Sequence, residues 1–186
     1  PMHLEWIQDI KARSGGVPFA ETYEYFFFAF NCRAAISFLQ ELSKLVADLN
    51  PIVEHRLLRE SIIVKKISKL WKLRDVTSFK DLIWKIYLQY EHTSFWRDGS
   101  RGDLPTLAKP LLLPIVTVLH VIQQDLGFAD SGNDPTWLAC VDEAEFLPRQ
   151  YIRCFNTFIR SESRPLVLKL TTFPSKHSTR ETLIEG

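Results

Sequence analysis

The segment TWLACVDEAEFL, residues 136–147, carries carboxylates directly after an apolar run. Asp142 and Glu143 are adjacent, and Glu145 comes two positions later. In a parallel α/β sheet, ligands bind at the carboxyl ends of the strands. Two adjacent acids at such an end suit phosphoryl transfer, because one can hold hydrated Mg²⁺ while the other orients or deprotonates the attacking water. A strand that simply ends in solvated acids would show the same pattern.

The residues around these acids predict a strand, a helix and a second strand. Residues 136–141 form a short apolar run, and a helix begins at Pro148 and runs through Arg160. PLVLKLTTF, residues 165–173, is typical of another buried strand. Apolar strands joined through a helix indicate a parallel sheet with helices on both faces, so the expected fold class is α/β. Cys140, inside the first strand, is expected to pack in the interior.

The N-terminal part of the chain predicts a further strand and helix. ETYEYFFFAF, residues 21–30, is rich in aromatic residues and short, which favours a buried strand. Asn31 is a plausible N-cap for the segment that follows. From there apolar residues recur at helical spacing up to Leu49, and Pro51 ends the pattern.

Residues 52–74 predict an amphipathic helix with a basic side. The apolar side is expected to contain Leu58, Ile62, Ile63, Ile67, Leu70 and Trp71. The opposite side is expected to contain Lys65, Lys66, Lys69, Lys72 and Arg74. Such a face is typical of a solvated helix, and phosphate contacts with nucleic acid are the alternative.

Two more helices are expected before the acidic segment. Ser78 with Asp81 three residues later forms a capping-box-like start for a helix to about Tyr90. Residues 92–106 are rich in turn formers and predict a loop. A fourth helix, entered between Pro110 and Pro114, runs to Leu126.

The composition is ordinary for a globular protein. The 186 residues are 46% hydrophobic and 24% charged, and 23 Lys and Arg against 22 Asp and Glu give +1. This balance creates no general attraction to nucleic acid or anionic lipid. Cys32, Cys140 and Cys154 match no zinc spacing and are expected to be reduced thiols in a cytoplasmic protein. No apolar run approaches the roughly 18 residues of a membrane span, and no leader pattern opens the chain.

Two segments resemble a known family. WLACVDEAEFL resembles the Walker B element of P-loop ATPases, an apolar strand that ends in Asp-Glu. CFNTFIRSESRPLVLKLTTFP, residues 154–174, is similar to the helix and sensor strand of AAA+ ATPases, most of all the origin-recognition-complex-like branch. The resemblance covers roughly the last 50 residues well, and residues 21–49 loosely. It implies part of a P-loop NTPase core with ATP and Mg²⁺ as cofactors.

The resemblance also implies roles for individual residues. Asp142 matches the magnesium-associated acid and Glu143 the catalytic base, and both are candidate metal ligands. Asn156 and Arg160 match motif positions in the helix after Walker B and are grouped with Asp142 as candidate nucleotide-binding residues.

A further match with the family and one departure from it both concern groups that would contact the phosphates of ATP. Thr171 or Thr172 matches the sensor-1 residue that reads the γ-phosphate, and two β-branched residues ending a strand are the simpler interpretation. No G-x-x-x-x-G-K-[ST] occurs in the sequence, so the loop that cradles phosphates is missing. We therefore expect a partial ATPase-like domain, either cut from a longer protein or degenerate: a strand–helix unit (1–51), a helical insert (52–127) and a Walker B and sensor-1 unit (128–186).

These observations leave three hypotheses open. The first is part of an AAA+-type ATPase that couples Mg·ATP hydrolysis to remodelling of a protein or DNA partner, although this segment alone is not expected to hydrolyse ATP. The second is a non-catalytic helical protein-interaction module on a degenerate ATPase core, with a protein partner or self-association. The third is a metal-dependent nuclease that uses Asp142, Glu143, Glu145 and Lys169. Apolar residues around Lys169 fit the nuclease poorly.

Overall fold

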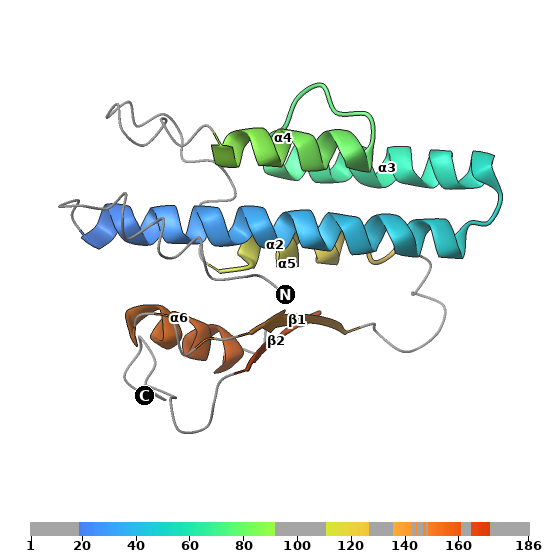
Figure 1. Cartoon of the computed structure of the whole chain (residues 1–186). Coiled ribbons are helices and arrows are strands. Elements are labelled where there is room, and N and C mark those ends of the chain that lie inside the picture. Colours follow the sequence, from blue (N-terminus) through green and yellow to red (C-terminus); the bar gives the residue numbers. More distant parts are fainter. Residues whose placement is uncertain are drawn as a thin grey trace. The chain divides into compact units, whose positions relative to one another are not determined.

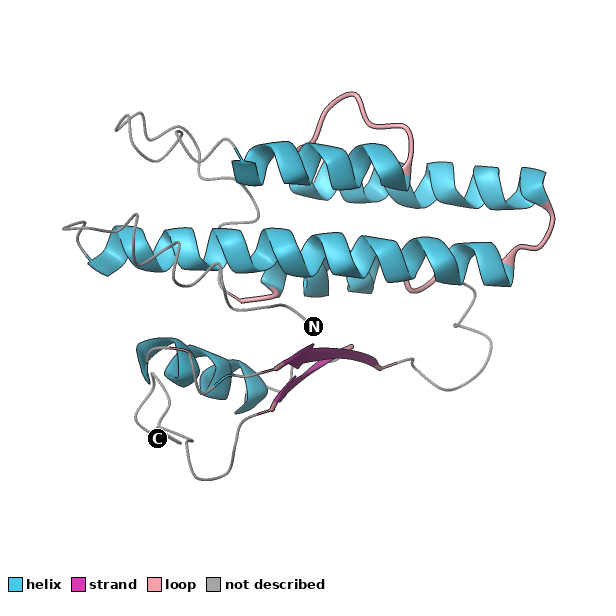
Figure 2. Ribbon diagram, in the orientation of Figure 1, coloured by secondary structure: helices cyan, strands magenta, loops and turns pink. Residues whose placement is uncertain are grey.

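A computed structural model describes much of the chain in two compact units. One unit is Tyr23–Asp134, and the other combines Pro1–Thr22 with Pro135–Gly186. The first is built from helices and the second contains the two strands (Figures 1 and 2). The described residues are 19–91, 111–126, 136–142, 144, 147, 149–160 and 165–171.

Helix α2 (Phe19–Leu49) occupies the segment predicted as a strand over residues 21–30 followed by a helix. The strand prediction is wrong. The side chains of residues 26–30 are all buried, at most 5% exposed, and a helix that is buried on every side is apolar all round. Phe26 and Phe30, one turn apart, stack with ring centroids 6.1 Å apart. The aromatic density therefore reflects helix burial, and no Gly or Pro interrupts α2.

Asn31 lies inside α2 and is not the N-cap that the sequence suggested. Its side chain is fully buried, and its Oδ1 accepts a hydrogen bond from the backbone N–H of Leu112 at 2.9 Å. Leu112 has φ 54°, in the left-handed region, immediately before helix α5 (Leu113–Ile122). Asn31 thus ties the middle of α2 to the start of α5.

The three other helices predicted for this unit are present, but two of them end earlier than predicted, at Trp71 and Ile122. They are α3 (Val53–Trp71), α4 (Phe79–Glu91) and α5, with α3 packed against both α4 and α5. Trp71 Nε1 donates to the backbone oxygen of Pro114 at 3.1 Å. The backbone N–H of Phe79 donates to Glu60 Oε1 at 2.9 Å. Side-chain hydrogen bonds therefore fix the C-terminal end of α3 to α5 and a more central part of α3 to the start of α4.

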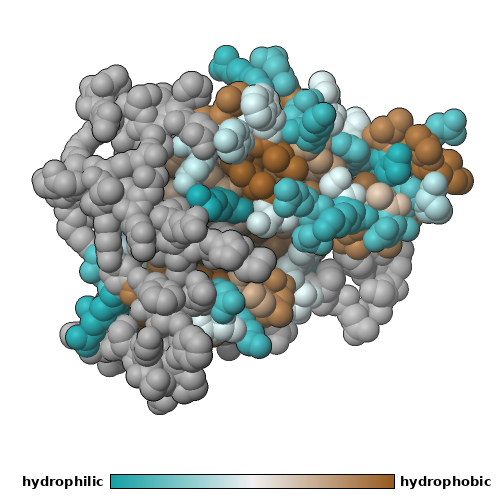
Figure 3. Space-filling model, in the orientation of Figure 1, coloured by the Kyte–Doolittle hydropathy of each residue, from teal (hydrophilic) through white to brown (hydrophobic). Residues whose placement is uncertain are grey.

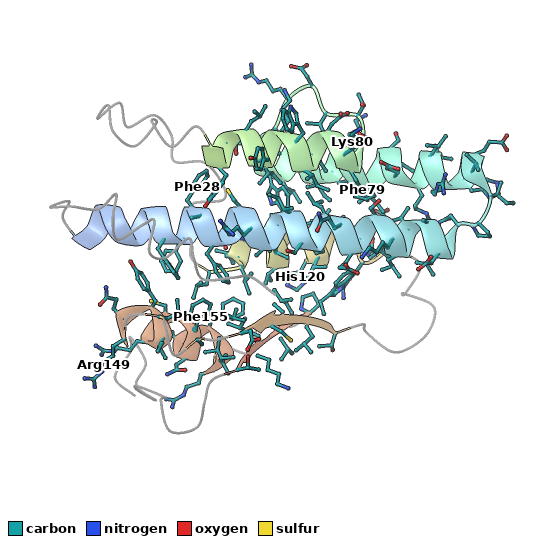
Figure 4. All side chains as sticks on the ribbon, viewed as in Figure 1. Phe28, Phe79, Lys80, His120, Arg149 and Phe155 are labelled. Carbon is teal, nitrogen blue, oxygen red and sulfur yellow. The ribbon has the colours of Figure 1, made fainter. Side chains whose placement is uncertain are left out.

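The start of α4 carries the predicted capping box. The Ser78 hydroxyl accepts a bond from the Asp81 N–H at 3.1 Å, and Asp81 Oδ2 accepts bonds from the hydroxyl and the N–H of Thr77. The Thr77 hydroxyl, followed by the Thr77 N–H, lowers the pKa of Asp81. Figure 4 shows Phe79 and Lys80 just inside this cap, Phe79 buried against the helices and Lys80 exposed.

The apolar side of α3 differs from the prediction at two positions. Ile63, Ile67 and Trp71 are buried as expected. Leu58 is 64% exposed and Ile62 is 40% exposed, so both are wrong as members of the buried stripe. They lie at helical spacing from Lys65 and share its exposed side.

The second unit contains a strand–helix–strand arrangement, as predicted. Its elements are β1 (Trp137–Val141), α6 (Arg149–Arg160) and β2 (Leu166–Leu170). The strands pair in parallel, with Trp137 opposite Leu166 and Val141 opposite Leu170. Helix α6 packs against β2.

The buried face of α6 is aromatic. Phe155 is fully buried, whereas Arg149 is exposed and extends from another side of the helix (Figure 4). Tyr151 is also buried, and burial raises the pKa of its hydroxyl. Ile152 and Cys154 are the other buried residues of the helix.

One face of the sheet is open where the sequence predicted cover. Leu138 is 61% exposed and its register partner Val167 is 45% exposed. Cys140 on the same face is exposed, so the interior position expected for it is wrong. Over the described residues the sheet has two strands. The chain is therefore mostly helical, and its α/β character is confined to this unit.

Candidate functional site

The carboxyl ends of β1 and β2 bring two of the predicted site residues together. Val141 and Leu170 are register partners at the last position of each strand. Asp142 is the next residue after β1, and Thr171 is the next residue after β2. Because the strands are parallel, both side chains sit at the same edge of the sheet.

Hydrogen bonds continue beyond the strands and fix this edge. The Thr171 N–H donates to the Val141 oxygen at 2.9 Å, and the Ala144 N–H donates to the Thr171 oxygen at 3.0 Å. The Thr171 hydroxyl donates to Asp142 Oδ1, with a longer contact of 3.4 Å to the Val141 oxygen. The backbone on both sides of the acidic pair is thus held against the end of β2.

The register explains why Thr171 meets Asp142. Side chains alternate along a strand, so Cys140 and Asp142 lie on one face, and Lys169 and Thr171 alternate in the same way. Cys140 is the register partner of Lys169. The next pair along the ladder is Asp142 with Thr171, on the open face of the sheet. The sequence left Thr171 and Thr172 as alternatives; Thr171 lies at this edge beside Asp142, and Thr172 lies outside the described residues.

Three further predicted residues lie outside the described part of the chain: Glu143, Glu145 and Thr172. Their roles remain predictions. The residues that flank Glu143 are described, and Ala144 is fully buried. Leu147, also buried, donates its N–H to the Ala144 oxygen at 3.1 Å. Two buried residues linked by this hydrogen bond therefore follow the acidic pair.

Asn156 and Arg160 lie on α6 and not at the strand ends. They are four residues apart, so they share one side of the helix. Asn156 is half-buried and Arg160, in the last turn, is exposed. Their position on the helix between the two strands agrees with the motif positions that they match in sequence.

The chemistry of the described edge suits a hydrated cation better than a dehydrated one. Within the described residues no group of three or more His, Cys, Asp or Glu side chains could hold a metal ion. Mg²⁺ needs no such cage, because it keeps several waters and binds through one or two carboxylates. Asp142 supplies an exposed carboxylate, and Thr171 supplies a hydroxyl beside it. The residues present therefore fit a hydrated Mg²⁺, whereas the sequence offers no phosphate-cradling loop.

Two further observations concern the cysteines and the helices of the described residues. Cys32, Cys140 and Cys154 are all free thiols, as the sequence predicted. Among the helices in the described ranges, none combines the length and apolarity needed to span a bilayer.

Comparison with known proteins gives one match. The family model described as ORC-CDC6-like matches residues 1–186, the whole chain. No curated protein and no solved structure matches the chain. The chain therefore belongs to the ORC-CDC6-like family, in agreement with the branch that its Walker B-like and sensor-like segments resemble.

Proposed function

We propose that this member of the ORC-CDC6-like family contributes the Walker B and sensor-1 edge of an AAA+-type Mg·ATP site. The observation that carries the proposal is the hydrogen bond from the Thr171 hydroxyl to Asp142 at the shared carboxyl end of two parallel strands. Such an end is where α/β sheets bind ligands. Family membership over the whole chain supports the same assignment.

In the proposed site Asp142 holds Mg²⁺ through the water shell of the ion. The carboxylate is exposed, so a cation bound there would keep several of its waters. The Thr171 hydroxyl orients this carboxylate through its hydrogen bond and would contact the γ-phosphate as the sensor-1 group. Thr171 is therefore the proposed sensor-1 residue, with Thr172 as the adjacent candidate.

Glu143 is the proposed general base. It orients the attacking water and accepts its proton as the bond from the water oxygen to the γ-phosphorus forms and the bond to the β–γ bridging oxygen breaks. Its neighbours Asp142 and Ala144 are both hydrogen-bonded to Thr171. Asn156 and Arg160 are proposed to support the nucleotide from α6.

The proposal requires a phosphate-binding group from outside these 186 residues, because they contain no G-x-x-x-x-G-K-[ST]. The β- and γ-phosphates need a backbone nest and a lysine that this segment does not supply. In the complete site, hydrolysis would drive remodelling of a protein or DNA partner in the cytoplasm. Sequencing the gene on both sides of the segment shows directly whether it encodes the missing phosphate-binding group.

Variants of the complete gene product test the roles. Glu143→Gln is expected to lower kcat for ATP hydrolysis about 100-fold or more, as loss of a general base does. Asp142→Asn is expected to weaken Mg²⁺ binding, so that half-maximal turnover needs a higher Mg²⁺ concentration. Glu41→Gln is the matched control, since Glu41 is 64% exposed and its ion pair is with Lys44 on α2. Unchanged turnover in the Glu143 variant would refute the base assignment.

A second function, a non-catalytic helical interaction module, is favoured by one feature. Residues 23–134 form a compact helical unit of their own, with a core that uses no residue of the strand-end site. Calorimetric titration of the complete gene product with Mg·ATP separates the two proposals. Binding that Asp142→Asn weakens supports the ATPase site, and no binding supports the module.

A further inference from the structure

The exposed side of α3 carries a narrow stripe of apolar and charged residues. Its members follow one another at intervals of four, four, three and four residues, which places them on one side of a helix. All are exposed, Leu58 at 64% and Ile62 at 40%. The stripe consists, in order, of Glu54, Leu58, Ile62, Lys65 and Lys69.

A solvated helix face does not account for this stripe. Leu58 and Ile62 sit at its centre, where a purely solvated face would carry polar side chains. The exposed apolar surface continues to the end of the helical unit where α2 meets α3, seen as brown surface in Figure 3. Exposed residues at that end are Leu49, Ile52, Val53 and Leu57, each between 47% and 56% exposed. Clustered apolar exposure of this kind marks an interaction surface.

We propose that this stripe pairs with the same stripe of a second copy of the chain, with the two α3 helices antiparallel. The stripe reads acid, apolar, apolar, base, so reversing it places unlike charges opposite each other. Leu58 of one copy then packs on Ile62 of the other, and Glu54 faces Lys65 across the interface. A two-fold axis near Glu60 generates each contact twice, as an isologous interface requires.

The spacing along the helix supports this register. Glu54 is four residues before Leu58, and Lys65 is three residues after Ile62. At about 1.5 Å per residue these offsets differ by roughly 1.5 Å along the axis, which the flexible lysine side chain spans easily. In the described part of the chain neither Glu54 nor Lys65 takes part in an ion pair, so both are available for a partner.

The charges of the stripe disfavour the other occupants. A bilayer surface would draw the carboxylate of Glu54 toward lipid together with Leu58, which is costly. An acidic helix would match Lys65 and Lys69 but would meet repulsion from Glu54. A parallel pairing of two copies would place lysine against lysine. The antiparallel second copy pairs Glu54 with Lys65 in both directions and leaves Lys69 beyond the paired region.

Charge reversal tests the proposal by sedimentation velocity on the purified protein. The wild type is expected to form a dimer as its concentration rises. Glu54→Lys and Lys65→Glu are each expected to weaken the dimer about tenfold, because each places two like-charge contacts in the interface. The double variant reverses both charges and is expected to restore the wild-type Kd. Circular dichroism checks that each variant keeps its helix content.

The surface pair on α2 provides the control. Glu41→Lys and Lys44→Glu alter an exposed pair on another helix, so neither is expected to change the Kd. A protein that stays monomeric up to about 200 μM overturns the proposal. So does a dimer whose double variant is weaker than either single variant. Pelleting with vesicles of phosphatidylcholine and phosphatidylserine that Leu58→Glu abolishes, without dimerisation, would assign the stripe to a membrane surface.

Discussion

Replacing Asn31 by leucine should destabilise the helical unit by removing a buried hydrogen bond to Leu112. Asn31 is fully buried, and its Oδ1 accepts the N–H of Leu112, which is 1% exposed, at 2.9 Å. Leucine has a similar volume but no acceptor. The N–H of Leu112 would then be buried without this partner, at a cost of about 1–3 kcal/mol.

The backbone at Leu112 sharpens the expected effect. Its φ of 54° costs a non-glycine residue about 1–2 kcal/mol, and Asn31 holds the N–H of this residue in place. We therefore expect the free energy of unfolding to fall by about 2 kcal/mol, the middle of the range of about 1–3 kcal/mol for an unpaired buried N–H. This loss corresponds to roughly a 30-fold increase in the equilibrium constant for local opening. Local opening should increase first at the start of α5.

Urea unfolding and amide exchange measure this prediction together. Asn31→Leu should lower the unfolding midpoint without changing the slope, and the Leu112 amide should exchange about 30-fold faster. Asn50→Leu is the control, because Asn50 is half-exposed and its side chain donates to the Val46 oxygen at the end of α2. Equal stability losses in the two variants would refute the special role of the Asn31 bond.

Two further predictions follow from titrating groups. The folded-state pKa of Asp81 is lowered, first by the Thr77 hydroxyl, so its contribution to stability is present above the unfolded pKa and is lost as pH falls through the folded value. Asp81→Asn should therefore flatten the acid limb of an unfolding-midpoint profile, and an unchanged limb would contradict the assignment. Burial raises the pKa of the Cys32 thiol, whereas Cys140 is exposed. Iodoacetamide followed by mass spectrometry should modify Cys140 in the native protein and Cys32 after unfolding, and early labelling of Cys32 would be the contrary result.

The second unit was predictable from sequence because its pattern is local. An apolar run, a helix and a second apolar run are typical of two parallel strands, because parallel strands need a long crossover that is usually a helix. This arrangement places Asp142 and the residue after β2 at one edge before any coordinates are known. The contact between Thr171 and Asp142 needed the register, which depends on the pairing of Val141 with Leu170.

The N-terminal strand was mispredicted because aromatic residues favour strands only on average. In α2 the run from Phe26 to Phe30 is buried on every side, and that burial depends on tertiary packing that a short window does not reveal. The better signal was length, since residues 19–49 contain no Gly or Pro and a strand of that size is rare.

The exposed residues were the least predictable. Leu58 and Ile62 repeat with the buried stripe closely enough to be assigned to it, and only packing against α4 and α5 decides which side of α3 is covered. Cys140 was expected inside because parallel strands are usually covered on both faces. Its exposure follows from the open face of the described sheet, which the sequence pattern of β1 does not encode.

Paramagnetic Mn²⁺ tests the proposed site most directly. Mn²⁺ with ATP, titrated into the isotope-labelled complete gene product, should first broaden the amide signals of Ala144 and Thr171, whose backbones meet beside Asp142. Signals of Trp137 and Leu166, which pair at the opposite end of the same two strands, should broaden later, and Asp142→Asn should abolish the broadening. Broadening that starts elsewhere, or that persists in the Asp142 variant, would contradict a magnesium site at the ends of β1 and β2.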